Sequence, residues 1–587
     1  MFFAFLILLN IFPPDWEALY KALTIEGEDR VQAMEIYKKY SSRNDTLGIF
    51  SLYKMACLDE KDSYGWFLKL KSKNPPKEML EDAYKKLIED ENEKAINDYE
   101  RIKKGFSLRF RKKIEEKIFL KRFEKNKDKR AVLYQAIKEG KRVALILSKR
   151  AISEGEKLPE GVLKELLSLS LKYRDLELFQ GLISNHLREK ELGQKEIFLL
   201  GRFYFLKKEY EKSINYFERL KDEKALFQKA RAYLYIGKEK EAILTLENIK
   251  KELLSEAQYL LLRIKLKNGK LEEAEKHLNL IKKMGLKSKA TLNMAIHLNF
   301  YGKKDEAKAL LGRMKENNEI KFWKNRLEGI ENLSFMPQDS PFNYFFNGKY
   351  PQFQVSETPL NLNFKPVNFP QFLVFKGFVK EGLFFRNTLK FDPVFLSKLY
   401  LSQKKYKNAI NSIYSEAENV LKKDIGQWNI EVLRIYFPRA YGEEVKKLCK
   451  EYKIPSNLFW AVMRQESLFE EEAISSEGAL GLMQVLPQNY LLYGEDLENP
   501  FEKEKNMRVS LKYLKELKER FGEWVYVISA YNAGEEAVSF WLKDPIMADL
   551  PSFYSTIPFE ETKVYTRNVL FNLMMYNILY GEEDEKS

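Results

Sequence analysis

We predict an all-α protein in which a solenoid of stacked helical pairs precedes a mostly helical C-terminal domain. Glycine (27) and proline (19) are sparse among the 587 residues, while 32% of the residues are charged, and this composition favours helices over β-rich architecture. The first half carries a repeat of 32–33 residues, a period typical of helical solenoids. A chain of this length exceeds one ordinary core, so two or more domains are expected.

The chain begins with an apolar run of eleven residues, Phe2 to Phe12, that ends at a Pro-Pro pair. This run has the length of a signal-peptide core and is too short to span a membrane. No Lys or Arg precedes Lys21, so the usual basic flank is missing. We interpret residues 1–14 as a signal segment, and a buried first helix is the alternative.

Residues 15–335 are expected to form the solenoid. The segments G-K-E-K-E-A-I, G-K-L-E-E-A-E and G-K-K-D-E-A-K place Ala242, Ala274 and Ala307 32 and 33 residues apart, and a weaker copy has Ser213 at the alanine position. A helix, a Gly-Lys turn and a second helix with an early small residue resemble the tetratricopeptide repeat. Because one such pair cannot bury its own apolar face, neighbouring pairs must stack into an α-superhelix.

Residues 336–435 differ in composition from the solenoid. Between Met336 and Gly377 six prolines stand among many aromatic residues, so helix is not expected there. We predict an irregular, ordered connection packed on the solenoid. A further repeat copy, K-K-Y-K-N-A-I from Lys404 to Ile410, predicts linker helices before the last domain, residues 436–587.

The net charge indicates what the protein could bind. Lys and Arg (100) exceed Asp and Glu (86), which gives +14 spread along the chain. Such a field favours a polyanion, either an anionic cell-wall polymer or the surface of an anionic membrane or envelope. No nucleic-acid-binding motif is present, and a merely solvated basic surface is the alternative. No oligomeric state is predicted.

Rare residue types exclude several chemistries. The histidines are His186, His277 and His297, and the cysteines are Cys57 and Cys449. The second half therefore cannot contain a Ser-His-Asp triad, a Cys-His dyad or a His-ligated metal site. Two distant cysteines make neither a disulfide framework nor a redox motif. Chemistry in the second half must use carboxylates.

One carboxylate stands out, in the segment A-V-M-R-Q-E-S-L-F. If this segment is a helix that starts near Ser456 as N-cap, Glu466 lies on the same face as Phe459, Val462 and Met463. Burial of an ionised carboxylate is costly. Either Glu466 pairs with a nearby cation at the edge of the stripe, or the apolar surroundings raise its pKa so that it can donate a proton.

Three later segments carry small or polar residues among apolar ones. In S-E-G-A-L-G-L-M-Q-V-L-P, the small residues Gly478, Ala479 and Gly481 let the backbone approach a ligand or a partner helix, and Gln484 offers an amide. S-A-Y-N-A-G ends an apolar helix at a Gly. I-P-F-E-E-T-K-V-Y places Glu561 four residues before Tyr565, on one helical face.

Together these segments resemble the four motifs of the soluble lytic transglycosylase catalytic domain. The motifs are E-S at Glu466, G-x-x-G-L-M-Q ending at Gln484, A-Y-N-A-G, and I-P-F-x-E-T-x-x-Y, in the family's order and spacing over roughly residues 436 to 580. The resemblance implies a goose-lysozyme-like, mostly helical domain behind an α-superhelical region. Two positions depart from the family: Leu486 stands where Met is common, and Lys563 stands where Arg is common. A lysine lacks the planar fork that makes a bidentate contact.

The resemblance also implies the activity. It is cleavage of the β-1,4 bond between N-acetylmuramic acid and N-acetylglucosamine in peptidoglycan glycan strands, outside the cytoplasm in the periplasm or cell envelope, with a 1,6-anhydromuramoyl product and no metal or organic cofactor. Glu466 is the implied acid and base, and the positions that match the sugar cleft are Ser467, Gln484, Tyr531, Asn532, Glu561 and Tyr565. A lysozyme-type hydrolase on the same domain and a non-catalytic repeat scaffold are the alternatives.

Overall fold

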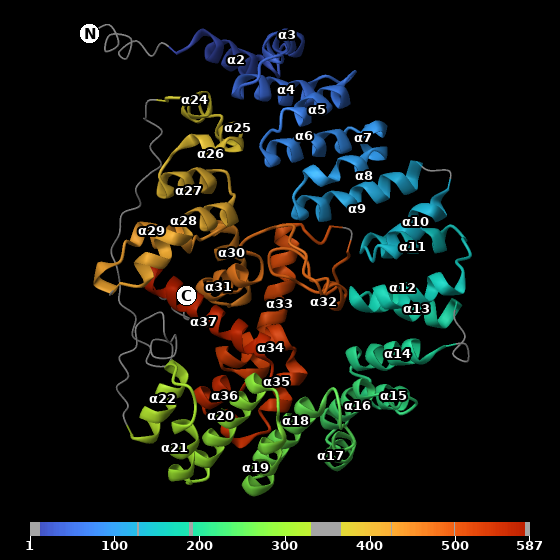
Figure 1. The fold of residues 1–587 in the computed structure, drawn as a ribbon, viewed down its shortest axis with the longest axis vertical. Helices are drawn as coiled ribbons and strands as arrows, with labels where there is room; N and C mark the ends of the chain where they lie inside the picture. Colours follow the sequence, from blue (N-terminus) through green and yellow to red (C-terminus); the bar gives the residue numbers. More distant parts are fainter. Residues whose placement is uncertain are drawn as a thin grey trace. The chain divides into compact units, whose positions relative to one another are not determined.

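The computed structural model describes residues 12–125, 128–186, 192–329, 366–423, 425–497 and 499–581, which are mostly helical (Figure 1). This part of the chain contains no strand, only isolated bridges that join Leu480 to Ile474 and to Val485. The predicted all-α class is confirmed. The apolar run at the N-terminus, apart from its last residue, and the segment 330–365 lie outside the described residues. Among the described helices none is both long and apolar enough to cross a membrane.

The helices belong to two compact units, each built from two separated pieces of the chain. Unit 1 consists of Met1–Val162 and Thr358–Lys405, and unit 2 of Leu163–Glu357 and Tyr406–Ser587. Unit 2 thus combines part of the predicted solenoid with the predicted C-terminal domain. The domain boundaries at residues 335 and 435 stay predictions, because the units follow contacts rather than sequence order.

Unit 1 has an aromatic core to which both of its pieces contribute. Its helices are α2 (Pro14–Ile25), α3 (Arg30–Tyr40), α4 (Thr46–Leu58), α5 (Ser63–Ser72), α6 (Lys77–Glu89), α7 (Glu93–Asn97), α8 (Tyr99–Ile102), α9 (Leu108–Lys125), α10 (Lys129–Lys138), α11 (Val143–Ser153), α24 (Phe369–Phe375), α25 (Val379–Phe384), α26 (Arg386–Leu389) and α27 (Pro393–Ser402). Phe369 contacts Phe50 with ring centroids 5.4 Å apart, and Phe372 contacts Trp16 at 5.5 Å.

Helix α24 corrects one prediction. We expected no helix between residues 336 and 377, yet the described end of that segment is helical at Phe369–Phe375. Asn368 caps this helix by accepting a hydrogen bond from the Gln371 backbone, and Pro370 stands in the first turn, where its missing N–H costs nothing. The prolines therefore mark the start of a helix here rather than its absence.

In unit 2 the first piece forms helical hairpins. Its helices are α12 (Glu160–Lys172, which begins in unit 1), α13 (Leu176–His186), α14 (Gln194–Leu206), α15 (Tyr210–Phe217), α16 (Glu223–Tyr235), α17 (Glu239–Glu247), α18 (Leu254–Lys267), α19 (Leu271–Leu280), α20 (Met284–Phe300), α21 (Lys304–Gly312) and α22 (Asn318–Leu327). Each Gly-Lys segment found in the sequence is the turn of one hairpin, so the helix-turn-helix repeat is confirmed from α16 to α21.

The repeat turns share one backbone conformation. Gly237, Gly269 and Gly302 have φ of 78°, 69° and 82°, in the left-handed region, and Lys208 and Lys404 occupy the same place in the weaker copies with φ of 62° and 53°. The small residues that follow each turn, namely Ser213, Ala242, Ala274, Ala307 and Ala409, are completely buried. Ser213 fits because its hydroxyl donates to the Gly201 carbonyl at 2.8 Å.

The second piece of unit 2 contains the predicted catalytic segment. Its helices are α28 (Tyr406–Leu421), α29 (Ile430–Tyr436), α30 (Gly442–Tyr452), α31 (Ser456–Ser467), α32 (Pro487–Leu492), α33 (Lys503–Phe521), α34 (Trp524–Ala533), α35 (Glu535–Trp541), α36 (Leu550–Thr556) and α37 (Glu560–Tyr580). Helix α37 packs along α31 and α34, so one long helix supports most of the predicted motifs.

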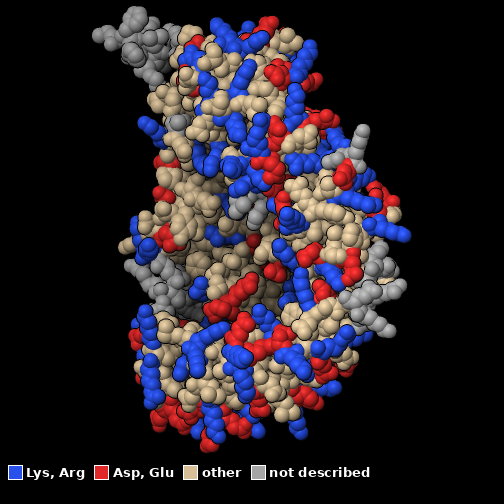
Figure 2. Space-filling model, turned by 45° about the vertical axis from the view of Figure 1, so that its right-hand side comes forward, with Lys and Arg blue, Asp and Glu red and all other residues tan. Residues whose placement is uncertain are grey.

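Polar contacts fix the repeat helices of unit 2 to this second piece. His297 on α20 meets Asp544 at 3.1 Å, both side chains being buried, and Trp323 on α22 donates to the Ser555 hydroxyl at 3.0 Å. Lys563, at the position where Arg was expected, reaches both carboxylate oxygens of Glu319 at 2.8 and 3.0 Å with a single ammonium group. Acidic and basic side chains are interleaved over the visible surface, as Figure 2 shows.

Candidate active site

Helix α31 carries Glu466 on its buried side. The apolar residues that precede it on that face, Phe459, Val462 and Met463, have no exposed surface, as the helical spacing predicted. The N-cap is Pro455 rather than Ser456, which is the first helical residue. Glu466 itself is half-buried as a residue, at the end of this apolar face.

Buried asparagines join α31 to α37. Asn457 donates to the Asn577 side chain at 3.0 Å and to the Gly581 carbonyl at 2.8 Å. Asn572 donates to the Ala461 carbonyl at 3.3 Å. Because breaking a buried hydrogen bond leaves an unsatisfied polar group, these contacts fix the register between the helix that carries Glu466 and the helix that carries its partner.

That partner is Tyr565, whose hydroxyl donates to Glu466 Oε1 at 2.6 Å. Burial raises the pKa of Glu466 to about 8, the hydrogen bond from Tyr565 acts in the opposite direction, and the nearby charge of Glu561 raises the pKa further. Burial dominates because it disfavours the ionised form. At neutral pH Glu466 is therefore mostly protonated and can serve as an acid.

The chain leaves α31 through two left-handed residues. Leu468 and Phe469 have φ of 52° and 65°, although neither is glycine, and such backbone costs of order 1–3 kcal/mol for each residue. Tyr441 compensates by donating to the Phe469 carbonyl at 3.3 Å. Ser467 is buried. Its hydroxyl accepts a hydrogen bond from the Glu470 backbone at 3.2 Å, which stabilises this turn.

The loop from Ala473 to Leu486 is closed by the side chain of Asn506 on α33. Asn506 is fully buried, donates to the Leu480 carbonyl at 2.8 Å and accepts from the Met483 backbone at 2.9 Å. A Cβ on Gly481, which has φ of 77°, would lie 2.5 Å from this amide. The small residue was predicted to allow close approach of a ligand or a helix, and here it allows the approach of a helix.

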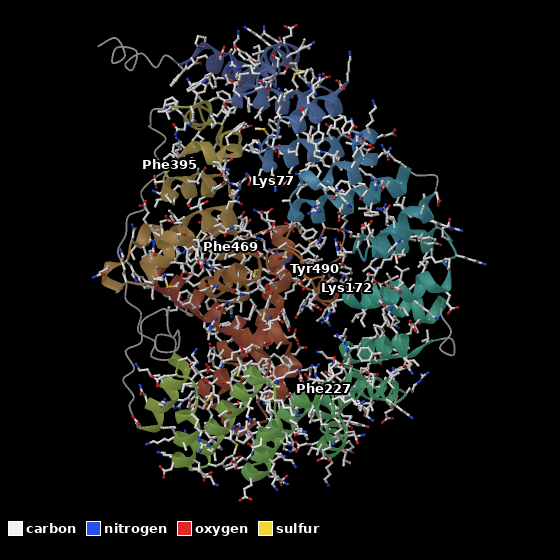
Figure 3. The ribbon with its side chains drawn as sticks, viewed as in Figure 1. Lys77, Lys172, Phe227, Phe395, Phe469 and Tyr490 are labelled. Atoms are coloured by element: carbon white, nitrogen blue, oxygen red, sulfur yellow. The ribbon has the colours of Figure 1, made fainter. Side chains whose placement is uncertain are left out.

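Gln484 completes the loop. Its backbone is left-handed with φ of 49°, and its side-chain amide donates to the carbonyls of Ala473 and Gly481 at 3.1 and 2.8 Å. The side-chain nitrogen is thus used within the loop. Figure 3 labels Phe469, two residues after the end of α31, and Tyr490, which lies on the short helix that follows the loop.

Tyr531 links the loop to α33 and α34. Its hydroxyl donates to the Met483 carbonyl at 2.9 Å and shares a hydrogen bond with Ser510 at 2.9 Å. Burial, followed by the charge of Glu466, raises its pKa well above the usual range, which places Tyr531 near Glu466. Asn532, the next residue, accepts from the Thr562 hydroxyl at 2.7 Å.

Three of the predicted site residues are linked to Glu466, and the others make contacts elsewhere in the domain. Tyr565 contacts it, while Glu561 and Tyr531 act on it or respond to it through charge. Glu561 is exposed one turn before Tyr565 on α37. Ser467 and the side-chain nitrogen of Gln484 are used in local hydrogen bonds. The substrate-binding roles assigned to all of these residues stay predictions.

Two residues were missed by the sequence reasoning: Asn506 and Ser510. Both are buried polar residues on α33, one helical turn apart. The available signal was a pair of small polar side chains at i and i+4 within the apolar stripe of that helix. Among the described residues no group of three or more His, Cys, Asp or Glu side chains is placed to hold a metal ion.

Comparison with known proteins covers part of this site: Glu466 and Asn532 lie within the matched segment, whereas Glu561 and Tyr565 lie beyond it. Residues 443–547 match the family described as "Transglycosylase SLT domain". A soluble lytic murein transglycosylase of Escherichia coli (strain K12) is 31% identical over 157 residues, which is 25% of this chain and 24% of that protein. A Haemophilus influenzae relative is 32% identical over 166 residues, 27% of this chain and 28% of that protein. The chain thus matches about a quarter of the length of these relatives.

Solved structures are similar over nearly the whole chain, at low scores. The lytic transglycosylase Slt of Pseudomonas aeruginosa, solved as an inactive mutant, covers 98% of both chains with 17% identity and a TM-score of 0.42. The 70 kDa soluble lytic transglycosylase of Escherichia coli covers 97% of both chains with 14% identity and a TM-score of 0.46. At such low TM-scores, the fold is assigned from the helices of this chain and not from these structures.

Proposed function

We propose that this protein is a peptidoglycan lytic transglycosylase, because residues 443–547 match the transglycosylase SLT domain family. It cleaves the β-1,4 bond between N-acetylmuramic acid and N-acetylglucosamine and leaves a 1,6-anhydromuramoyl end. The observation that carries the proposal is a single acidic group within this segment, Glu466, whose pKa burial raises to about 8. A carboxylic acid that stays protonated near neutral pH can protonate a glycosidic oxygen.

The reaction needs one carboxyl group in two roles. Protonated Glu466 first gives its proton to the leaving oxygen as the glycosidic bond breaks. The carboxylate then takes the proton of the muramic 6-hydroxyl, whose oxygen forms the new bond to the anomeric carbon, so the acid is regenerated and no water is consumed. The substrate's own 2-acetamido group would stabilise the positive charge of the transition state, as in the substrate-assisted glycosidases.

The surrounding residues would orient the sugar and the acid. Tyr565 donates to Glu466 and thereby holds the carboxyl group in one rotamer. We assign Glu561, which is exposed, and Asn532, which is half-buried, to contacts with the sugars. Ser467 and Gln484 would act by shaping the turn after α31 and the loop that follows it.

Product analysis tests this proposal. Purified sacculi digested with the full-length protein should lose turbidity, and mass spectrometry should find 1,6-anhydro ends. Reducing ends instead would assign a lysozyme-type hydrolase, in which water replaces the 6-hydroxyl. Unchanged turbidity, with folded protein and sacculi that a known lysozyme clears, would assign a non-catalytic repeat scaffold.

We also propose that the protein works in the periplasm or cell envelope. The supporting observations are the location of the substrate and the apolar run from Phe2 to Phe12. The excess of basic residues, +14 overall, would favour peripheral association with anionic envelope components. Cell fractionation tests this location, and recovery of the full-length protein from the cytosol alone would reject it.

A further inference from the structure

A cavity separate from Glu466 lies inside unit 2, between repeat helices α16 and α18 and the segment that leads into α37. Its volume is ≈ 270 Å³, just below the range of about 300–1,000 Å³ for small-molecule sites. Most of its wall is apolar, with six aromatic rings from both pieces of the unit: Phe227, Tyr235, Tyr259, Phe540, Trp541 and Phe559. Figure 3 labels Phe227, which lies on α16.

Two guanidinium groups line this cavity without a carboxylate partner among the described residues. Arg263 on α18 is half-buried and makes no hydrogen bond or ion pair within this part of the chain. Arg231 on α16, also half-buried, bonds the neutral Gln228 side chain at 3.2 Å. Its guanidinium carbon lies 5.2 Å from the Phe205 ring centroid and 5.8 Å from that of Phe559. Both cations are therefore partly desolvated and available to an anion.

The other charged groups of the cavity are already paired. Lys267 pairs with Glu239, and Glu256 pairs with Lys283. Asp544 meets His297 at 3.1 Å. Each acid that lines the cavity therefore has one partner, although the second carboxylate oxygen of Glu256 is buried without a hydrogen bond among the described residues. Three cations and two acids line the cavity, so it presents a surplus of positive charge beside apolar walls.

The walls are held in place from both sides. Lys289 on α20 donates to the Pro558 carbonyl and to Glu560, both at 3.0 Å. Tyr235 packs against Phe540 with ring centroids 5.8 Å apart. The cavity is therefore a formed site, and ordering it would add little to the cost of binding.

We propose that this cavity binds the carboxylate-bearing stem peptide of peptidoglycan, at a second site separate from the cleavage site. An Arg fork recognises a carboxylate through two parallel hydrogen bonds, and the aromatic walls suit short aliphatic side chains. In intact peptidoglycan the free carboxylates lie on the stem peptides and not on the sugars. The choice of ligand rests on the proposed function, whereas the anion-binding chemistry rests on Arg231 and Arg263.

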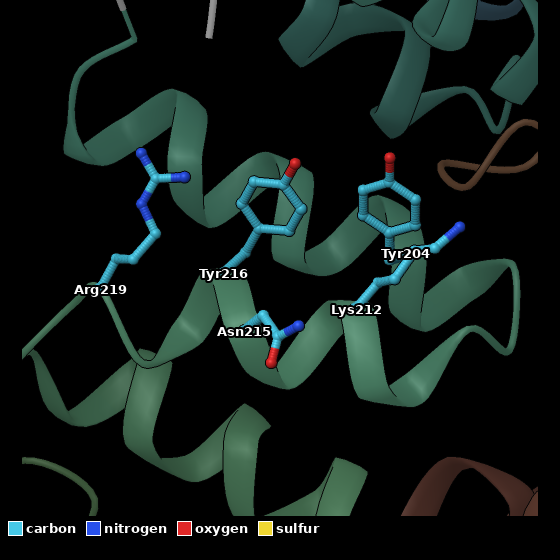
Figure 4. A pocket seen from close by; sticks show the side chains of 5 residues that line it. All are labelled: Tyr204, Lys212, Asn215, Tyr216 and Arg219. Atoms are coloured by element: carbon cyan, nitrogen blue, oxygen red, sulfur yellow. The ribbon is translucent and has the colours of Figure 1, made fainter. Parts of the chain in front are cut away.

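A second hollow in the repeats does not have this chemistry. It is lined by Tyr204, Lys212, Asn215, Tyr216 and Arg219 on α14, on α15 and just after α15 (Figure 4). Lys212 is bonded to Glu209 at 2.5 Å, and the Arg219 guanidinium carbon lies 5.6 Å from the Tyr216 ring centroid. This hollow has no aromatic enclosure from the second piece of the unit.

Isothermal titration calorimetry with the full-length protein tests the site. The probe is the dipeptide N-acetyl-L-Ala-D-Glu, which carries two free carboxylates, and the matched probe is its diamide. The dipeptide should bind saturably, and the diamide should bind at least about tenfold more weakly because it cannot form charge-assisted bonds. No binding of the dipeptide, or equal binding of both probes, would overturn the proposal without any variant.

Variants then locate the binding. The double substitution Arg231→Gln, Arg263→Gln should weaken dipeptide binding at least about tenfold, whereas Arg219→Gln, Arg313→Gln, which removes the same two charges at exposed positions on the repeats, should not. Wild-type affinity in the double variant would overturn the assignment, and a thermal midpoint confirms that it is folded. On sacculi the double variant should raise KM and leave kcat unchanged.

Failure of the proposed activity can be told apart from failure of this site. Glu466→Gln protein should bind the dipeptide with wild-type affinity, because Glu466 does not line the cavity. If sacculi were not cleaved and the dipeptide still bound through Arg231 and Arg263, the proposed activity would be rejected and the peptide site would be supported.

Discussion

Left-handed backbone occurs both in the repeat hairpins and around Glu466, but it is stabilised differently in the two regions. At the repeat turns Gly237 and Gly302 have open space where a side chain would stand, and lysine takes the same conformation at Lys404. Around the candidate site the left-handed residues include Leu468, and Gly481 packs directly on the Asn506 side chain.

The two regions differ in the tertiary contacts that stabilise their left-handed residues. A repeat turn needs only a local conformation, so glycine or lysine serves and few other residues are involved. The turn after α31 and the loop after it are held by side chains from other helices, as when Tyr441 donates to the Phe469 carbonyl. A strained backbone conformation persists where many contacts from the surrounding structure hold the residue in it. Substitutions in the two regions should therefore differ in size.

The largest effect is expected for Glu466→Gln. The amide keeps the shape and can accept from Tyr565, but it has no transferable proton. General acid–base catalysis typically contributes about 10²–10⁴-fold to the rate. Removal of a group that serves two steps should therefore lower the activity by at least the upper figure. Release of anhydromuropeptides from sacculi, measured on a folded preparation, checks this. Activity within tenfold of wild type would remove Glu466 from the mechanism.

The same variant has a second readout in its stability. Because burial raises the folded-state pKa of Glu466 to about 8, the folded protein holds this proton more tightly than the unfolded chain. Wild-type stability should therefore fall, relative to the variant, as the pH rises from about 4.5 to about 8. Chemical denaturation at pH 5 and pH 8 measures the difference, and a pH-independent difference would contradict the raised pKa.

Gly481→Ala should come next in size, and Gly302→Ala is its matched control. Both glycines have positive φ, 77° and 82°, so each alanine meets the left-handed penalty of about 1–2 kcal/mol. At Gly481 the added Cβ also meets Asn506, so the total loss should be roughly 3 kcal/mol or more. Chemical denaturation of both variants tests this, and equal losses would break the comparison between the two regions.

Tyr565→Phe should have a smaller effect, most visible in the pH profile. In the wild type kcat/KM should decline as the pH rises through about 8, where Glu466 loses its proton. The Tyr565 hydrogen bond lowers the pKa of Glu466, so its removal should shift the alkaline limb upward. A downward shift, or none, would show that this hydrogen bond does not govern the titration. Ser510→Ala serves as a control, because Ser510 bonds Tyr531 and not Glu466.

The smallest effect is expected at a repeat turn. Lys404 is exposed with φ of 53°, and glycine there relieves left-handed strain while it adds freedom to the unfolded chain. Lys404→Gly should therefore raise the free energy of unfolding by only about 0.5 kcal/mol. Calorimetry of the variant checks this. A loss above about 1 kcal/mol would mean that the turn depends on contacts of its lysine.

The sequence predicted features that depend on nearby residues. The Gly-Lys turns, the buried alanines after them and the position of Glu466 on an apolar face all follow from helical periodicity, which is a local pattern. The failure at α24 has a local cause as well. Prolines were read as helix breakers, but Pro370 follows a capping Asn368 and stands in the first turn, the one place where a helix tolerates it.

Features that depend on distant residues were not predictable in the same way. No spacing in the sequence relates Asn506 to Gly481, although the side-chain amide of Asn506 closes the loop that contains Gly481. The pairing of His297 with Asp544, 247 positions later, has no local signal either.

The asparagine contacts between α31 and α37 make the last turn of α37 part of the support for Glu466. Asn457 holds both Asn577 and the Gly581 carbonyl, more than a hundred positions away in the sequence. A carboxypeptidase that trimmed the chain back to Tyr576 would remove these anchors and leave the Asn457 amide without partners. Such trimming should abolish the proposed activity by loosening a helix from its far end, with Glu466 and Tyr565 still present.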